Sequence, residues 1–231
     1  MMSERVETDQ STSGALRSVP SGVALAAMLA ALLVAGCAEP VEVLPDHEID
    51  KSSLTYCEPE DGISFQEGED LQAHADCELL GGSMTLRPWL DEEAAHLVEL
   101  RVVEGDIGGP GFRSDAFSVT HFNRLEVIEG SLSFLSDEVI SLEGLTALRR
   151  IDGRLSLRMV PALRDFRGLQ NLRAVGELLI VHNDVLESLD GLSGLTHVRG
   201  DVTIRGNPRL SQDEVEAFVD RLQIGGEVKI D

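Results

Sequence analysis

Near its middle the chain reads Leu145-Thr-Ala-Leu148-Arg-Arg-Ile151-Asp-Gly153-Arg-Leu-Ser-Leu157. Up to Ile151 an apolar residue stands at every third position, and after Gly153 polar and apolar residues alternate. Such alternation points the apolar side chains of a short strand to one face. Glycine before the strand permits a tight corner and a close approach of the backbone. The stretch therefore predicts a corner followed by a strand with one buried face.

The same pattern recurs along the chain at regular intervals. Stacking the copies about 4.8 Å apart would pair their strands into a parallel sheet and align the apolar residues inside it. Repeats of this length are typical of solenoids. The sequence therefore predicts an all-β-dominated solenoid, a right-handed parallel β-helix of about seven leucine-rich-repeat-like turns of 23–26 residues. The glycines that open the strands are Gly82, Gly105, Gly130, Gly153, Gly176, Gly200 and Gly226.

Two further features belong to this prediction. The open end of a solenoid must be covered, because an exposed strand edge pairs with other chains. Ser211 and Glu214 have the spacing of a capping box, which predicts a helix over residues 212–222 as a C-terminal cap, followed by one short strand. Asn183 and Asn207 occupy matching corners after two of the strands, where asparagine adopts left-handed geometry or caps a turn.

The pattern Leu-x-x-Leu-x-x-Ile-x-Gly-x-Leu-x-Ile, opened by a segment from Cys57 to Cys77, resembles the receptor L-domain. This domain is the leucine-rich-repeat-like β-helix of insulin- and EGF-receptor ectodomains, and it also occurs in bacterial surface lipoproteins. The resemblance covers about residues 55–231. It implies a scaffold and no particular ligand, because receptor L-domains place different side chains on the same framework.

The N-terminal region has the features of a bacterial lipoprotein. Residues 23–35 form an uncharged apolar run that is shorter than the about 20 residues of a membrane-spanning helix. It leads into Val34-Ala35-Gly36-Cys37, which resembles a lipobox with Cys37 as the lipidated residue. Alternatively, the run is an uncleaved anchor, or Cys37 is a small buried residue.

These features divide the chain into three parts and predict its location. Residues 1–36 are a lipoprotein signal peptide, residues 37–54 an acidic, proline-containing and solvated tether, and residues 55–231 the solenoid. The protein is thus expected to be exported and held by lipid in the bacterial envelope. Ala38 stands where an aspartate often retains lipoproteins at the inner membrane, so we expect the outer membrane or the cell surface.

Cysteine usage agrees with export. The chain has three cysteines, and lipidation of Cys37 would leave Cys57 and Cys77 as a pair. Export favours a disulfide between them. The alternative is two free thiols.

Charge and the absence of known motifs exclude several functions. The chain has 19 Lys and Arg against 41 Asp and Glu, a net charge of −22 that repels nucleic acids and anionic lipid headgroups. Membrane attachment is therefore expected to be covalent. No metalloprotease, phosphate-loop or serine-hydrolase motif occurs, and the six histidines lack the spacing of metal ligands. We therefore expect neither an enzyme, a cofactor nor a metal. A polysaccharide-active β-helix enzyme is the alternative, but it needs clustered carboxylates.

One outward-facing set of residues is the candidate binding face. Apolar residues are disfavoured on a solvated sheet face, so a row that mixes them with arginines suggests a contact surface. We therefore expect a non-catalytic binding module for a protein or glycan ligand. The alternatives are ordinary cross-strand packing of this row and a structural or display lipoprotein without a defined ligand. The row consists of Arg87, Leu135, Arg158, Val181 and Arg205, with Leu179 beside Val181. Trp89, in the loop that follows Arg87, is added to this face; its alternative is local packing onto the first copies of the repeat.

Overall fold

The computed structural model describes residues 49–57, 75–86, 94–109, 117–135 and 139–231. Strands dominate these residues, which also contain one α-helix, and 13 strands join in a single sheet. The strands of this sheet pair in parallel. A strand-rich chain with a large parallel sheet is confirmed, and this arrangement is compatible with a solenoid.

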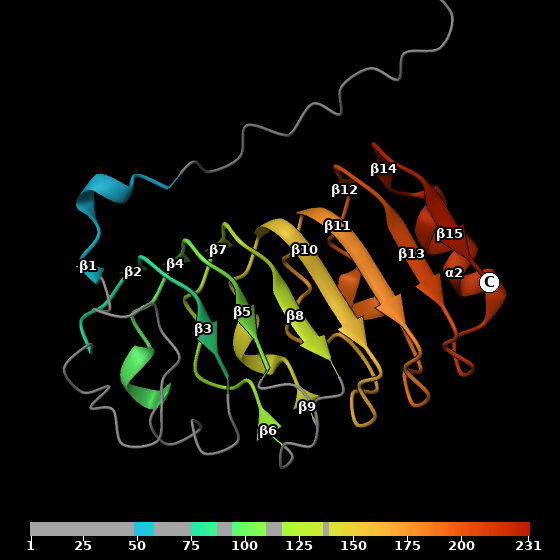
Figure 1. Cartoon of the computed structure of the whole chain (residues 1–231), viewed down its shortest axis with the longest axis horizontal. Coiled ribbons are helices and arrows are strands. Elements are labelled where there is room, and N and C mark those ends of the chain that lie inside the picture. Colours follow the sequence, from blue (N-terminus) through green and yellow to red (C-terminus); the bar gives the residue numbers. More distant parts are fainter. Residues whose placement is uncertain (1–48, 58–74, 87–93, 110–116, 136–138) are drawn as a thin grey trace, which may run out of the picture. The chain divides into compact units, whose positions relative to one another are not determined.

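The sheet consists of two columns of strands (Figure 1), which β10 (Arg150–Arg158) and β11 (Ala174–Val181) connect because each contributes to both. Strands within a column follow one another in sequence order. The first column contains β1 (Tyr56–Cys57), β2 (Leu79–Leu80), β4 (Val102–Val103), β7 (Val127–Ile128), the starts of β10 and β11, β12 (His197–Val198) and β14 (Gln223–Ile224). The second column contains β3 (Met84–Thr85), β5 (Ile107–Gly108), β8 (Leu132–Leu135), the ends of β10 and β11, β13 (Val202–Arg205) and β15 (Val228–Ile230).

Short irregular elements form the rest of each copy. A separate two-stranded sheet pairs β6 (Phe117–Ser118) with β9 (Val139–Ser141). Single 3₁₀ turns connect other segments, namely η3 (Ala94–Leu97), η4 (Glu143–Leu145) and η5 (Asp190–Leu192). Such turns use few residues and leave the backbone close to the neighbouring copy.

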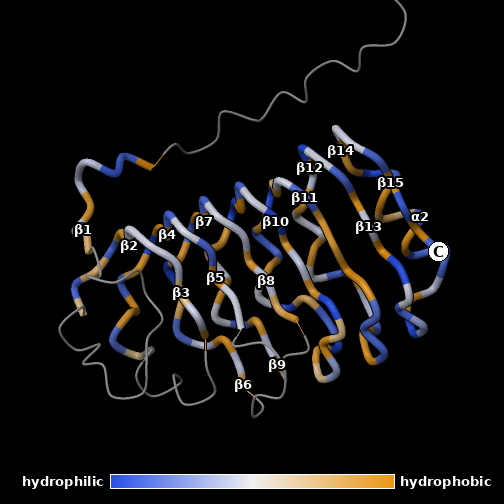
Figure 2. Tube along the Cα trace, in the orientation of Figure 1, coloured by the Kyte–Doolittle hydropathy of each residue, from blue (hydrophilic) through white to orange (hydrophobic). Residues whose placement is uncertain are grey.

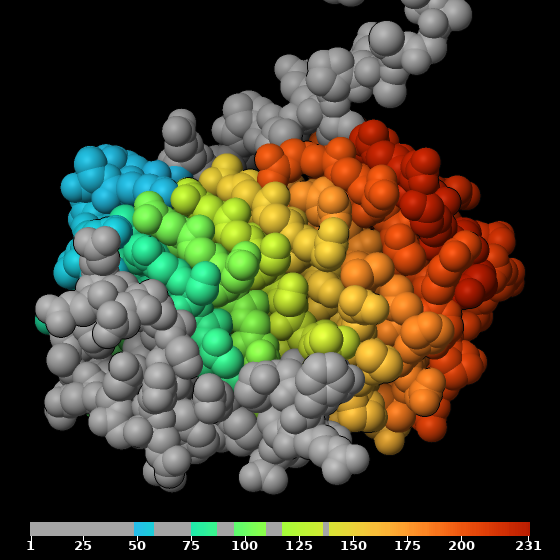
Figure 3. Space-filling view, in the orientation of Figure 1, coloured from blue at the N-terminus to red at the C-terminus, as the bar shows by residue number. Residues whose placement is uncertain are grey.

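The alternation in the strands produces the core. Leu155, Leu178 and Val202 pair across β10, β11 and β13, and each is at most 1% exposed. Figure 2 shows a hydrophobic stretch in β11, where both faces carry aliphatic side chains. The successive segments form adjacent bands on the surface in Figure 3. Aliphatic residues at matching positions therefore form one continuous core.

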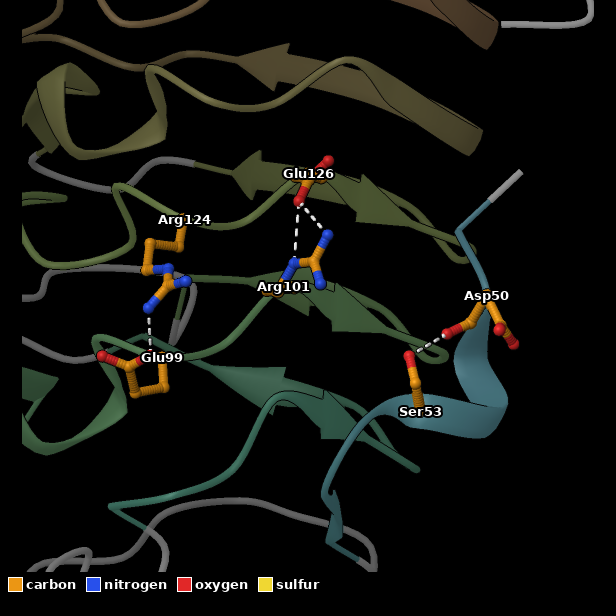
Figure 4. Close-up of polar contacts among 6 residues, drawn as sticks. All are labelled: Asp50, Ser53, Glu99, Arg101, Arg124 and Glu126. Atoms are coloured by element: carbon orange, nitrogen blue, oxygen red, sulfur yellow. Dashed lines mark hydrogen bonds and ion pairs between the residues drawn. The ribbon is translucent and has the colours of Figure 1, made fainter. Parts of the chain in front are cut away.

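Ion pairs on the surface connect neighbouring copies (Figure 4). The Arg101 guanidinium donates through Nε (2.8 Å) and Nη2 (2.7 Å) to one carboxylate oxygen of Glu126, 25 residues away. Arg124 and Glu99 form a second pair with the same offset. The pair of Arg124 and Glu99 is exposed and that of Arg101 and Glu126 is half-buried. Surface pairs contribute up to about 1 kcal/mol each, so they support the register rather than determine it.

The first described residues cover part of the outer face of the sheet. Ile49 and Leu54 pack against an outward apolar row of the first column, on either side of η1 (Lys51–Ser53). The prediction placed these residues in a solvated tether; instead they contact the folded unit, which begins at or before Ile49. The reason is that three successive copies expose an aliphatic side chain here that needs cover from water. The row is Leu79, Val102 and Val127.

Lys51 adds a charged contact to this cover. Its ammonium lies 3.0 Å from a Glu104 carboxylate oxygen and 2.6 Å from one of Glu129. Burial by itself lowers the pKa of Lys51, but hydrogen bonds and charge attraction from the two carboxylates outweigh it and raise the pKa above its usual value. The segment is therefore held by both apolar burial and an ion pair with two neighbouring copies.

The predicted disulfide between Cys57 and Cys77 is confirmed, with the two Cα atoms 5.8 Å apart. Cys57 pairs with Leu80 in the register of β1 and β2, and Cys77 is buried in the core. The bond therefore ties the first strand of the first column to the copy that follows. Closing a loop of this length stabilises the fold by about 3 kcal/mol in the loop-entropy model.

The predicted helix is present as α2 (Gln212–Asp220) and ends two residues before the predicted end at residue 222. Its start is as expected, because the Ser211 side chain accepts from the Glu214 N–H at 3.1 Å. The Glu214 carboxylate accepts from the Leu189 N–H at 2.7 Å, next to η5. The helix therefore packs beside the irregular part of the preceding copy. The strand that was expected after it is two strands, β14 and β15, which extend the two columns beyond β12 and β13.

The two corner asparagines form a ladder. The Asn183 Oδ1 accepts from the Val160 N–H at 2.9 Å, and its Nδ2 donates to the carbonyl of Leu157 at 3.2 Å. Asn207 Oδ1 accepts from the backbone and side chain of Asn183 at 3.0 and 3.1 Å. Of the two expected roles, capping is therefore the one observed. The left-handed conformation falls on the residue before each corner, at Met159, His182 and Gly206.

Candidate functional site

The register brings together four residues of the candidate binding face. Arg158 pairs with Leu135 on one side and with Val181 on the other, and Val181 pairs with Arg205. We call these four residues and Leu179 the outer stripe. They lie at the C-terminal ends of β8, β10, β11 and β13, on the outer face of the second column. Three other predicted site residues, Arg87, Trp89 and Cys37, lie outside the described residues.

Burial differs between the two kinds of residue in the outer stripe. Leu135, Leu179 and Val181 are half-buried, whereas Arg158 and Arg205 are exposed. Half-burial of the aliphatic residues agrees with cross-strand packing, which was the alternative explanation. The exposed guanidinium groups beside them add hydrogen-bond donors. Such a surface suits a ligand with both apolar and acceptor groups.

A groove that the sequence did not predict lies at the other end of the same strands. Its volume is about 710 Å³. It follows the glycine corners between the two columns and continues onto the outer face of β8, β10 and β11. Ser133 and Leu135 are successive residues on the outer face of β8, as Glu177 and Leu179 are on β11, so the groove and the outer stripe adjoin. The lining residues are Ser131, Ser133, Asp152, Gly153, Arg154, Gly176, Glu177, Arg199 and Gly200.

Charged groups of both signs line this groove in pairs. The Arg154 Nε donates to Glu177 at 2.6 Å, and the Arg199 Nη2 donates to Asp152 Oδ1 at 3.1 Å and to its backbone carbonyl. The four charges sum to zero. Carboxylates accept and guanidinium groups donate, so neighbouring pairs match ligand groups that do both, such as hydroxyls and amides. The groove therefore favours a neutral polar ligand over a bare ion.

The groove was not predicted from the sequence, because its charged residues come from different copies. Arg199 and Asp152 are 47 residues apart, so no short motif joins them. A signal existed in the position directly before the strand glycine, which carries Glu104, Glu129 and Asp152, then the uncharged Val175, and then the opposite charge at Arg199. Comparing this position between copies would have predicted an ion pair across a distance of two copies.

The structure offers no metal centre or membrane span among the residues that it describes. Across those ranges, no three His, Cys, Asp or Glu side chains come together in a way that could hold a metal ion. The helices within them are all too short or too polar to cross a bilayer. The apolar run at residues 23–35 lies outside these ranges.

Comparison with known proteins adds no relationship to this geometry. The chain matches no protein-family model, and searches of curated proteins and of solved structures find no significant match.

Proposed function

We propose that this protein is a surface-anchored bacterial lipoprotein whose solenoid is a non-catalytic binding module for a protein or glycan ligand. The solenoid would be a right-handed parallel β-helix with about seven turns, similar to a receptor L-domain. Its support is the parallel pairing of strands in sequence order, with hydrogen bonds between side chains and backbone 23 to 26 residues away. Each turn would then present side chains at equivalent positions on one outer face.

The observation that carries the binding proposal is the groove beside the outer stripe. Ligand sites are concave, and they combine apolar area with a few oriented polar groups. Here Leu179 and Val181 provide half-buried apolar area, while Arg154 and Arg199 provide donors in the adjoining groove. Leu179, Val181 and Arg154 lie in the strands β11 and β10, and Arg199 directly follows β12. A ligand that spans them would be recognised by hydroxyl or amide groups at one end and by apolar groups at the other.

Arg199→Ala is expected to weaken ligand binding about 10-fold or more, because a hydrogen bond to a charged group contributes roughly 1.5–3 kcal/mol. The measurement is a glycan and peptide array with the lipidated protein in detergent, followed by titration of the ligands that bind. The matched control is Arg164→Ala, which removes an equally long ion-paired side chain that does not line the groove. An array without any ligand would instead favour a display lipoprotein. Ligands that bind the Arg199→Ala protein unchanged would exclude the groove.

The anchor is proposed from the sequence, because Cys37 lies outside the described residues. Cys37→Ala is expected to abolish lipid attachment and to leave an unprocessed precursor, since the thiol is the group that is acylated. Labelling with a radioactive fatty acid and detergent partitioning measure both effects. In the control, Cys57→Ser with Cys77→Ser, the label should remain. Lipid-labelled protein without Cys37 would refute the proposed anchor.

A further inference from the structure

The last strands leave one edge of the sheet open. β15 pairs with β13 and β14 pairs with β12, and no other described strand pairs with either of them. The core is also incompletely covered there. Val228 is 44% exposed, whereas its counterparts in the two preceding copies, Val202 and Leu178, are 0% and 1% exposed. Val228 is therefore exposed to solvent, whereas a neighbouring strand covers the equivalent residue in the two preceding copies.

The backbone of β15 also has groups that face this edge. The Val202 N–H donates to the Glu227 carbonyl at 2.9 Å, so Glu227 points toward β13. Alternate residues of a strand direct their N–H and C=O groups to opposite sides. The N–H and C=O groups of Val228 and Ile230 therefore point to the open edge. Such an edge is a template for another strand.

We propose that this edge binds the same edge of a second copy, with the two β15 strands antiparallel around a two-fold axis and Val228 opposite the partner's Val228. In this register the outward N–H and C=O groups of the two Val228 residues form a closed pair of hydrogen bonds. The Val228 side chain would also contact the partner's Val228 side chain. A two-fold contact of this kind uses up the edge, so the assembly stops at two chains.

Complementary charges on β15 favour a second copy of this chain as the partner, and they favour the register centred on Val228. With Val228 at the centre, Glu227 lies opposite the partner's Lys229, and Lys229 lies opposite the partner's Glu227. Within one chain the Lys229 ammonium is already 2.7 Å from Glu227 and 3.8 Å from Asp201, so pairing would surround each ammonium with carboxylates. Opposite charges directly across a strand pair are stabilising.

Neighbouring registers fit less well. Moving one strand by two residues places Lys229 opposite the partner's Lys229 and Glu227 opposite the partner's Asp231, which opposes like charges. A further step centres the pair on Ile230 and uses Asp231, whose carboxylate already accepts from the Gly206 N–H at 2.9 Å. The register centred on Val228 places opposite charges across from each other at both positions that flank the central pair.

The test is cysteine cross-linking of the full-length protein in intact cells of the exporting host. Residues opposite each other in a hydrogen-bonded antiparallel pair have Cα atoms about 5.5 Å apart, within disulfide range. Val228→Cys should therefore give a disulfide-linked dimer on a non-reducing gel, and Ile230→Cys should remain monomeric. A monomeric Val228→Cys protein, or a dimer from Ile230→Cys instead, would overturn the proposal.

Charge exchange provides the second arm. Adding Glu227→Lys to Val228→Cys should lower the cross-linked fraction about 10-fold, because two attractive pairs become repulsive. Adding Lys229→Glu as well should restore cross-linking, because the charges are then exchanged and again opposite. Glu227 is exposed, so these changes leave the core intact, and resistance to protease checks the fold. Failure of the exchanged pair to restore the dimer would refute the proposed register.

Discussion

Gly168→Ala is expected to lower the free energy of unfolding by roughly 4 kcal/mol, from backbone strain together with steric overlap. Gly168 has φ of +108°, a conformation that residues with a side chain rarely adopt. A Cβ atom there would overlap the Leu142 carbonyl and would lie 2.9 Å from the Glu143 Cα. These are backbone atoms of the preceding copy, so they cannot move aside without separating the copies. Urea denaturation of the purified protein measures the change.

Gly108→Ala is the matched control. Gly108 has an ordinary φ, and the nearest atom to its added Cβ is the Ser133 carbonyl oxygen at 3.1 Å. This variant should change the free energy of unfolding by no more than about 1 kcal/mol, the typical range for glycine replacement at compatible positions. Equal effects of the two substitutions would show that the copies are not packed backbone against backbone at Gly168.

Gly168 belongs to a second set of glycines, distinct from those that open the strands. Gly144 approaches the backbone of Val119 and Thr120, and Gly191 that of Phe166, in the same way as Gly168 approaches Leu142. Each is followed by leucine, so Gly-Leu recurs in three copies. The pattern was visible in the sequence. Its meaning was not, because close approach between irregular segments has no strand periodicity to indicate it.

The features that were predicted from the sequence are those with a local cause. Alternation after Gly153 and its equivalents predicted the strands of the second column, and the spacing of Ser211 and Glu214 predicted the start of α2. The disulfide of Cys57 and Cys77 followed from counting cysteines in a chain that the sequence predicts to be exported. Each of these depends on residues within one copy or on composition.

The features that were missed depend on how separate parts of the chain are arranged in space. The cover formed by Ile49 and Leu54 requires an apolar row that becomes visible only when equivalent positions of three copies are aligned. The groove requires the pair of Arg199 and Asp152, which spans two copies. The exposure of Val228 results from its place in the last strand rather than from its residue type. Four residues of the outer stripe were aligned correctly, because they repeat at the same strand position, namely Leu135, Arg158, Val181 and Arg205.

Asn183→Ala is expected to lower the free energy of unfolding by roughly 4 kcal/mol, since each buried polar group left without a partner costs about 1–3 kcal/mol. Asn183 is 2% exposed. Alanine would remove the acceptor of the Val160 N–H and the donor to the Leu157 carbonyl, and it would also remove one hydrogen bond to Asn207. Two neighbouring corners would thus lose their connection. Thermal and urea denaturation measure the loss.

Asn171→Ala is the control that separates this effect from the loss of an ordinary asparagine hydrogen bond. The Asn171 side chain donates to the Thr146 carbonyl at 2.7 Å but is exposed, so water can replace it. Its replacement should cost no more than about 1 kcal/mol. The difference between the two variants measures the ladder itself, because both remove one amide from a corner and only Asn183 leaves buried partners behind. If Asn183→Ala lowers the free energy of unfolding by no more than Asn171→Ala does, apolar packing and strand pairing hold the copies together. The asparagine ladder would then contribute no stability of its own.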